Sequence, residues 1–366
     1  MSFRSALAGS LGAVALALAS ASASASASAA PAGPTPVLPV RIPGGVAAAD
    51  GTFVLVRTPE GAVEAVDAAT GASLWTSAAP ARALLVARGI AYVLEEPRPG
   101  ALRVLAVEPR TGVRASAWPL PPGALPAWAG LADGGGRVVT TVSVAARLAG
   151  ARLEVGLDAK QVTLGGMGLI PGPEAHAVTA IDTRSGAAEV APGGRLPAPP
   201  LTAQPPRGAG ALVRFHARAA DETVVLGGPP PNVEGVLVAG DVLVGFGWAP
   251  GAVTVHQWSA ATGARVTSVE IRAETDAIWA TLDRRHVALR RARDQRLVDV
   301  HAIDGGARIA TLEAPFDVSV VAGRVWWTHR NGSEVVLTAV DAERGRTLWR
   351  RTLARYADGA LGEPIP

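Results

Sequence analysis

Short apolar runs that alternate with polar residues recur along the chain, and many of them end at an acidic residue. Alternation with a period of two, as in Val63 and Ala65, predicts half-buried strands. The runs close on the tripeptide Ala-[Val/Ile]-[Asp/Glu], whose acid stands at Asp67, Glu108, Asp182, Asp304 and Asp341. We expect each acid to accept hydrogen bonds from backbone amides two or three residues further on, and so to close a turn.

Glycine follows four of these acids after four residues, and Trp follows two of the glycines. The glycines are Gly71, Gly112, Gly186 and Gly345, and each can supply the positive φ that a tight turn requires. A further copy keeps the turn without the acid, in residues 259–263. Trp75 and Trp349 stand four residues beyond their glycines, and such a ring offers a large flat face for packing against a neighbouring repeat.

A second motif, two apolar runs around a Gly or charged corner, precedes each acid turn. The clear copies cover residues 236–244 and 318–327, and looser copies lie at 46–56, 84–94, 131–141 and 278–289. Each unit therefore reads strand, corner, strand, loop, strand, acid turn, strand. Four antiparallel strands in a unit of about forty residues are typical of a β-propeller blade. We predict an all-β fold, a single β-propeller of four-stranded antiparallel blades.

The spacing of the acids gives an expected number of blades. Glu108 stands 41 residues after Asp67, and at that spacing the span from Asp67 to Asp341 favours eight blades, with seven as the alternative. Eight blades require two degenerate copies, near residues 144–157 and 218–226. If the propeller has seven blades, one of these regions is an inserted hairpin or loop. Residues 158–175 and 191–210, rich in Gly and Pro, are expected to be long connections.

The two ends of the chain differ from the repeats. Arg4, the apolar stretch Ala6 to Ala19 and the small residues that follow are typical of a signal peptide, so we divide the chain as residues 1–29 signal peptide, 30–45 linker with a closing strand, 46–354 propeller and 355–366 tail. Residues 37–42 are the expected outer strand of the last blade. The protein is expected to be secreted or periplasmic, without a transmembrane segment in the mature chain.

Composition narrows the chemistry. The chain has no Cys, which excludes disulfides, thiolate catalysis and Cys-bound metal, and removes the lipid-bearing Cys that a bacterial lipoprotein would need. The net charge is only +3 and Lys160 is the single lysine, so nothing in the charge predicts a nucleic-acid partner. We expect a monomer.

The pattern Ala-Val-Asp-x-x-Thr-Gly-x-x-x-Trp, seen in residues 65–75 and nearly in 339–349, resembles the repeat of the pyrroloquinoline-quinone-like β-propellers. Ser116, Val190 and Thr267 replace the Trp elsewhere, which implies looser or Leu- and Val-based docking between those blades. The resemblance covers two kinds of protein: quinone-dependent dehydrogenases, and the non-catalytic scaffold of the outer-membrane assembly machinery. The alcohol enzymes characteristically carry an adjacent Cys pair, so the resemblance favours the scaffold.

The histidines and the glycine-rich pieces give no pattern of a reactive site. The six histidines lack metal-ligand spacing, and three that lie shortly before a turn are expected to be structural: His176, His256 and His301. The others are His216, His286 and His329. The glycine pieces 134–136 and 165–166 do not open a helix and are not expected to bind phosphate. We assign no catalytic, cofactor-binding or metal-binding residue, and no cofactor.

Charged and aromatic clusters leave alternatives open. The Arg-rich stretch 284–296 is either a solvated blade edge paired with nearby acids or a surface for an anionic partner. Trp326 and Trp327 are consecutive on one strand, so one should be in the core and the other exposed or docked on a neighbouring blade. The remaining tryptophans could line the seams between blades or stack on carbohydrate: Trp128, Trp248, Trp258 and Trp279.

These observations favour an exported, non-catalytic propeller that acts as a protein-interaction scaffold in the cell envelope, with a protein partner still to be identified. The alternatives are a quinone-dependent alcohol or sugar oxidoreductase and a glycan-binding module. The fold does not decide between these functions.

Overall fold

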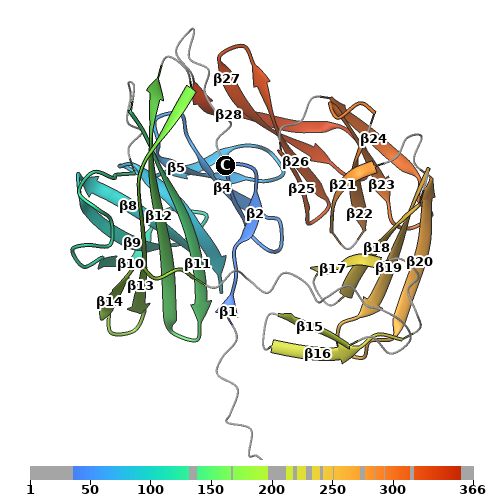
Figure 1. Ribbon diagram of the computed structural model, residues 1–366, viewed down its shortest axis with the longest axis horizontal. Helices are drawn as coiled ribbons and strands as arrows, with labels where there is room; N and C mark the ends of the chain where they lie inside the picture. Colours follow the sequence, from blue (N-terminus) through green and yellow to red (C-terminus); the bar gives the residue numbers. More distant parts are fainter. Residues whose placement is uncertain are drawn as a thin grey trace, which may run out of the picture. The chain divides into compact units, whose positions relative to one another are not determined.

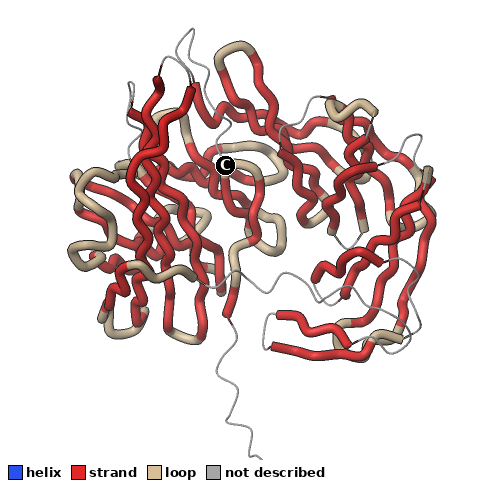
Figure 2. The backbone as a smooth tube through the Cα atoms, viewed as in Figure 1, coloured by secondary structure: helices blue, strands red, loops and turns tan. Residues whose placement is uncertain are grey.

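A computed structural model describes residues 36–131, 138–165, 168–196, 212–216, 221–227, 233–239, 242–249, 251–272, 277–283, 285–291, 293–313 and 317–355. The described residues form strands and loops only (Figure 2). Among them no helix is long and apolar enough to cross a membrane. The predicted signal peptide, residues 1–29, and the predicted tail beyond Arg355 lie outside the described residues.

The strands are grouped into sheets of neighbours in the chain (Figure 1). The first two groups are β2 (Val40–Ile42), β3 (Gly45–Ala47), β4 (Phe53–Arg57), β5 (Val63–Asp67) and β6 (Ser73–Thr76), then β7 (Ala81–Ala87), β8 (Ile90–Arg98), β9 (Ala101–Val107) and β10 (Arg114–Pro119). The next are β1 (Pro36–Val37) with β11 (Val138–Ala149), β12 (Arg152–Gly165), β13 (Gly168–Asp182) and β14 (Ala188–Pro192), then the pair β15 (Leu212–His216) and β16 (Asp221–Val225).

Three further sheets complete the described chain. They are β17 (Val233–Ala239), β18 (Val242–Ala249), β19 (Ala252–Ser259) and β20 (Arg265–Arg272); β21 (Ala277–Leu282), β22 (His286–Arg291), β23 (Leu297–Ala302) and β24 (Arg308–Glu313); and β25 (Asp317–Val321), β26 (Arg324–Asn331), β27 (Glu334–Asp341) and β28 (Thr347–Arg355). All pairings are antiparallel between the described strands, and successive four-stranded meanders are the architecture predicted for a β-propeller.

The number of units differs from the count favoured by the spacing. The described residues form six sheets of four or five strands and one two-stranded sheet, β15–β16. The prediction that residues 144–157 form a separate, degenerate repeat is wrong. These residues belong to β11 and β12 of the sheet that also carries Asp182. The second degenerate copy, at 218–226, falls partly outside the described residues. The blade number of the whole chain stays a prediction.

Residues 158–165 and 168–175 belong to strands β12 and β13 and not to the long connection that the Gly and Pro content of 158–175 predicted. Strands β11, β12 and β13 are 12, 14 and 15 residues long. One unit with long strands therefore fills the interval between Glu108 and Asp182 that the eight-blade interpretation divided in two. The predicted connection 191–210 is described only up to residue 196, where the chain has left β14.

The acid turns form as predicted at four of the five acids: Asp67, Glu108, Asp182 and Asp341. Asp67 Oδ1 accepts hydrogen bonds from the N–H groups of Ala69 and Thr70, at 3.0 and 2.9 Å, and Gly71 follows with a φ of +72°. The N–H of Thr70 is the largest factor that lowers the pKa of Asp67. Equivalent amide bonds close the turns at the other acids that precede a glycine: Glu108, Asp182 and Asp341.

The Trp residues of the repeat dock each sheet on the turn of the next. Trp75 Nε1 donates to Pro109 O at 2.7 Å, and Trp349 Nε1 donates to Ala68 O at 3.0 Å. The ring of Trp349 covers Gly71 so closely that a Cβ there would lie 2.5 Å from Trp349 Cγ. The last sheet of the described chain, β25–β28, therefore packs on the first, β2–β6.

The expectation that sheets without the template Trp dock through aliphatic residues is only partly right. In β10 the template Trp is replaced by Ser116, but Trp118 docks this sheet on the next turn. Its Cδ1 atom lies 3.2 Å from the Cβ position of Gly186. Ser116 pairs with Ala106 as Trp75 pairs with Ala65, and Trp118 stands two residues further along β10 on the same face. Between β17–β20 and β21–β24 the Cβ position of Gly306 lies 3.2 Å from Glu270 O, and the side chains that meet it are aliphatic, from Val269 and Ile271.

The corners of the second motif make a further set of bonds between sheets. Arg324 Nη1 donates to Gly51 O at 2.8 Å, and Arg88 Nη1 donates to Gly150 O at 3.0 Å. The Asp283 carboxylate accepts from the Gly323 N–H at 2.8 Å. Each bond joins a corner of one sheet to a corner of another, so both sequence motifs serve to hold neighbouring sheets together.

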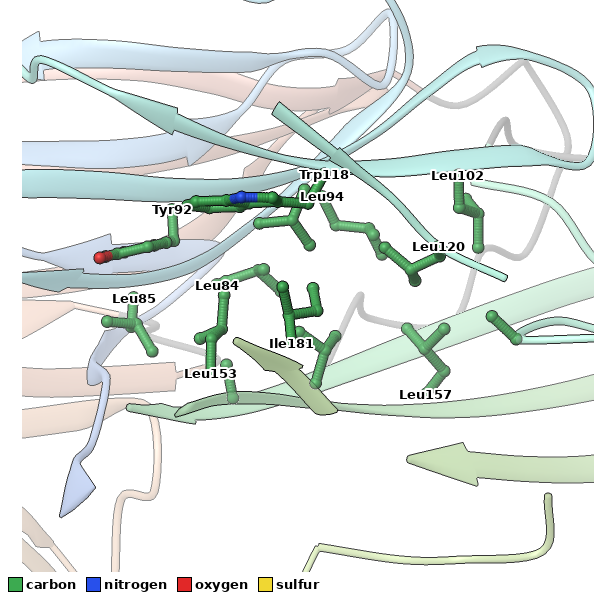
Figure 3. Close-up of a cluster of buried hydrophobic side chains, with 14 of the residues drawn as sticks. Leu84, Leu85, Tyr92, Leu94, Leu102, Trp118, Leu120, Leu153, Leu157 and Ile181 are labelled. Carbon is green, nitrogen blue, oxygen red and sulfur yellow. The ribbon is translucent and has the colours of Figure 1, made fainter. Parts of the chain in front are cut away.

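Apolar side chains fill the spaces between the sheets. Figure 3 shows the cluster between β7–β10 and β11–β14, where Tyr92 stacks on Trp118 with ring centroids 6.4 Å apart. Trp326 and Trp327 point to opposite faces of β26, as predicted, and both are buried: Trp326 packs towards β2–β6 and Trp327 towards β21–β24. Neither ring is exposed, because a sheet lies on each side.

The prediction that residues 37–42 form the outer strand of the last blade is wrong. Val37 pairs with Leu148 of β11, and residues 40–42 pair with β3 of the first large sheet. The outer strand of the last sheet is instead β28, from the C-terminal end of the described chain. Arg41 fixes the N-terminal segment further, since its Nη2 donates to Val144 O at 2.7 Å. The segment thus joins two sheets at their first-strand edges.

Candidate interaction surface

Strands β11–β13 continue beyond the part of their sheet that other strands cover (Figure 1). Strand β14 pairs only with residues 177–181 of β13, and β1 pairs only with the last two residues of β11. Among the described strands, none pairs with the outer edge of β13 from Gly168 to Ala175. This extension is the candidate interaction surface, because it presents side chains that the packing of the sheets does not require.

One face of the extension is buried near the other sheets and becomes exposed further along the strands. Residues Val142, Ala146 and Leu157 on this face are buried in the cluster that Figure 3 shows. Further along the same face the register places Val138 opposite Thr163 and Thr163 opposite Ile170. Val138 is 42% exposed and Ile170 57% exposed. The face therefore passes from packed core to a surface on which Val138 and Ile170 are exposed on either side of Thr163.

The opposite face carries a cluster of polar side chains that we call the polar face: Asp158, Lys160, Glu174, His176 and Arg195. Lys160 Nζ lies 2.9 Å from Glu174 Oε1, in side chains that are each about half exposed. The lysine lowers the pKa of Glu174 through its hydrogen bond and its charge. The register of β12 and β13 brings these residues together, since Lys160 pairs with Glu174 and Asp158 with His176.

His176 is held between an acid and a base. Its Nδ1 lies 2.5 Å from Asp158 Oδ1, and its Nε2 lies 2.5 Å from Arg195 Nη2. A guanidinium can only donate, so Nε2 accepts and the ring proton sits on Nδ1, donated to Asp158. Both ring nitrogens are therefore engaged. The arrangement therefore fixes the positions of Asp158 and Arg195, and Nε2 is not free to act as a general base.

His256 and His301 have structural places in their sheets, as predicted. His256 is buried with Nδ1 2.9 Å from Ser268 Oγ, and buried His301 donates from Nδ1 to Gly306 O at 3.1 Å. Both stand on the third strand of their sheet, three residues before the turn. His286 contacts Asp283, and the side chain of His216 lies outside the described residues. No group of three or more metal-ligating side chains occurs in the described part of the chain.

The Arg-rich stretch is mostly engaged within its own sheet. Arg291 makes a double hydrogen bond to Asp299, at 2.7 and 2.8 Å, and Arg296 Nη2 lies 3.4 Å from Glu313 Oε1. Arg290 Nη1 donates to Gln295 O at 2.5 Å. These contacts favour the structural interpretation of the stretch over an anionic partner. Two positions of the stretch, 284 and 292, lie outside the described residues, as do the side chains of Trp248 and Trp279.

Trp258 and Trp128, which were predicted to lie at seams between blades or to stack on carbohydrate, are both at least partly buried. Trp258 is fully buried, and its Nε1 lies 3.3 Å from Gly227 O. Trp128 is partly buried against the cluster of Figure 3. Both contacts favour seams between sheets over stacking on carbohydrate. The sequence did not point to the polar face, although Asp158 and Lys160 alternate at the period of a strand, as do Glu174 and His176, which was a usable signal.

Three buried or partly buried histidines predict how stability depends on pH. Burial lowers the pKa of His256, His301 and His329 below the ordinary value. The unfolded chain then binds protons near pH 6.5 that the folded chain does not bind, so stability falls as the pH falls through that value. Urea unfolding should show a lower midpoint at about pH 5.5 than at about pH 7.5. A His301→Gln variant should show a shallower dependence, and equal midpoints for the wild type would contradict the assignment.

Comparison with known proteins supports the interpretation of the repeat. A family model described as outer membrane protein assembly factor BamB matches residues 14–190. No curated protein sequence matches the chain. Solved structures of similar chain path include an uncharacterized protein, lmo1340, from Listeria monocytogenes (8% identity, covering 88% of this chain and 96% of that one, TM-score 0.40). Hsv2 of Kluyveromyces lactis is another (12% identity, 87% and 100% covered, TM-score 0.37), as is apo AztD of Citrobacter koseri (10%, 86% and 87%, TM-score 0.33). The sequence match over residues 14–190 and the acid turns are both consistent with a repeat of the pyrroloquinoline-quinone-like propeller type.

Proposed function

We propose that this protein is an exported, non-catalytic scaffold of the cell envelope that binds a protein partner through the polar face. The pattern of residues 1–29 supports export, and the family model, named for an outer membrane assembly factor, supports an envelope role. The observation that carries the proposal is the pre-ordered cluster on the extension of β11–β13. Its charges are paired with one another, so they are positioned for a partner before it arrives.

The composition of the polar face suits a protein surface. Asp158 and Glu174 balance Lys160 and Arg195, so the face is rich in donors and acceptors without a net charge of either sign. A partner with complementary polar groups would gain orientation from such a face more than raw affinity. The surrounding sheets are locked by the Trp and corner contacts, which keep the face in one geometry.

The test exchanges the two members of an ion pair. Lys160→Glu with Glu174→Lys keeps the internal pair but reverses the charges that a partner meets. Immobilised protein is incubated with envelope extract, crosslinked, and its partners are quantified by mass spectrometry. We expect the exchange to lower capture of the main partner about tenfold while leaving the unfolding midpoint unchanged.

A matched control comes from a second exposed ion pair. Arg296 and Glu313 lie in a different sheet, β21–β24, and their exchange should leave capture unchanged. Equal capture by wild type and by the Lys160/Glu174 exchange would show that the polar face does not bind the partner. Failure of the wild type to capture any partner above an unrelated propeller would overturn the scaffold proposal itself.

A further inference from the structure

The far end of the extension is apolar, and we call it the apolar tip: Val138, Val139, Val162, Ile170 and Pro171. Residues 161–173 of the sequence contain no charged residue. The nearest charged residues along the chain are Arg137, Lys160 and Glu174. One step further along the register, Leu164 pairs with Leu169. A charge-free run of this length is unusual between two paired strands, because the ends of hairpins are normally rich in polar residues.

The apolar side chains face both ways. Val138 and Ile170 stand on the face that continues the core, whereas Val139 stands on the opposite face in register with Val162 and Pro171. Val139 is 38% exposed. Three of the five large apolar side chains that are exposed in the described chain gather here; the other two are Val113 and Val266. A protein docking on one face would leave the other in water, whereas a lipid phase would cover both.

We propose that the apolar tip inserts into the interfacial region of a lipid bilayer, so that the protein binds membranes through this hairpin. A depth of three residues corresponds to about 10 Å at the rise of a β-strand, which matches the depth reached by interfacial protein segments. Lys160 and Glu174, with their ion pair, then lie at the level of the headgroups and set the limit of insertion. The inference goes beyond the protein partner and does not depend on it.

The backbone of the outer edge of β13 is compatible with this environment. Unpaired amide groups of an open strand edge are costly in an apolar medium. On β13, Pro171 and Pro173 have no N–H to leave unpaired. The same two prolines hinder the addition of another strand to this edge. Side chains, and not edge pairing, are therefore the expected means of contact.

Neutral lipid should suffice for binding. The ion pair Lys160–Glu174 carries no net charge, and Arg137 is the only unbalanced flanking charge in the sequence next to the tip. Apolar contact should therefore dominate over attraction to anionic headgroups. Binding through a basic patch would behave differently, because it would be lost on neutral vesicles and in high salt.

The experiment is co-sedimentation of the purified full chain with phosphatidylcholine vesicles, with and without phosphatidylglycerol. We expect the wild type to bind both, and Ile170→Asp to lower the partition coefficient about tenfold. Ile170→Trp should bind at least as well as the wild type, because Trp favours the bilayer interface. Val266→Asp changes an equally exposed valine on β20 and should bind like the wild type.

The outcomes separate this inference from the scaffold proposal. Loss of vesicle binding by Ile170→Asp with unchanged partner capture supports the inference. Absence of wild-type binding to either kind of vesicle overturns it, as does equal loss in Ile170→Asp and Val266→Asp. If Ile170→Asp instead abolishes protein capture while the wild type ignores vesicles, the tip binds protein and the lipid assignment is wrong. The Lys160/Glu174 exchange should keep vesicle binding.

Discussion

Replacing Trp349 by Ala should destabilise the protein by about 4 kcal/mol, the largest effect we expect from a single side chain. The ring is buried between the last and first sheets, makes an edge-on contact with Trp326 at 5.5 Å between centroids, and donates to Ala68 O. Its removal leaves a cavity and an unpaired carbonyl at one seam. Urea unfolding followed by circular dichroism measures the change.

Trp349→Phe is the matched control for that loss. It keeps most of the apolar ring and removes the Nε1 bond to Ala68 O, so we expect about 1–2 kcal/mol. A loss below about 1 kcal/mol for Trp349→Ala would mean that the seam between β25–β28 and β2–β6 contributes little to stability.

The Asp299→Asn variant should cost about 3 kcal/mol at neutral pH. Asp299 is buried and receives a double hydrogen bond from Arg291 and another from Thr311 at 2.7 Å. Burial raises the pKa of Asp299, but these bonds outweigh it and hold the pKa below its ordinary value. Neutralising the acid leaves the partly buried guanidinium of Arg291 without its counter-charge, which is more costly than losing an exposed pair.

The pH dependence of that difference checks its cause. A folded pKa below the unfolded value means that the stabilisation is complete above about pH 4 and is lost as the pH falls through the folded pKa. The gap between wild type and Asp299→Asn should therefore shrink in acid. Asp294→Asn, in the same sheet's loop but exposed, should cost less than about 1 kcal/mol. Equal costs for the two variants would show that the Arg291 contact is not stabilising.

The acid turns could be predicted from the sequence because all of their hydrogen bonds lie within a few residues of the acid. An acid that caps amides two and three residues away, followed by a Gly with positive φ, needs no distant partner, and Asp67 with Gly71 forms as expected. Trp118 was missed because it stands two residues beyond the template position Ser116, on the same face of β10, and still reaches the turn at Gly186. A linear template fixes one docking position, whereas a large ring at a neighbouring position on the same face can make the contact instead.

The long strands were missed for a different reason. Spacing between acid turns cannot distinguish two short units from one unit with strands of 12–15 residues. Pro171, Gly172 and Pro173 suggested a loop, but prolines are tolerated on an open strand edge, where their missing N–H is not needed. The polar face was missed with the strands, since Asp158 and His176 meet only when β12 and β13 pair.

A double-mutant cycle between Gly71 and Trp349 tests most directly whether Trp-over-Gly contacts hold the sheets of this scaffold together. A Cβ at Gly71 would meet Trp349 at 2.5 Å, whereas a Cβ at Gly89, with a similar φ of +73°, would meet nothing within 4 Å. The account predicts that Gly71→Ala costs more than Gly89→Ala in the wild type. In a Trp349→Gly background, which removes the ring and also the Trp349 Cβ that lies 2.7 Å from the same position, the two costs should become equal, at about 1 kcal/mol. An unchanged cost of Gly71→Ala after removal of Trp349 would contradict the docking between the last and first sheets.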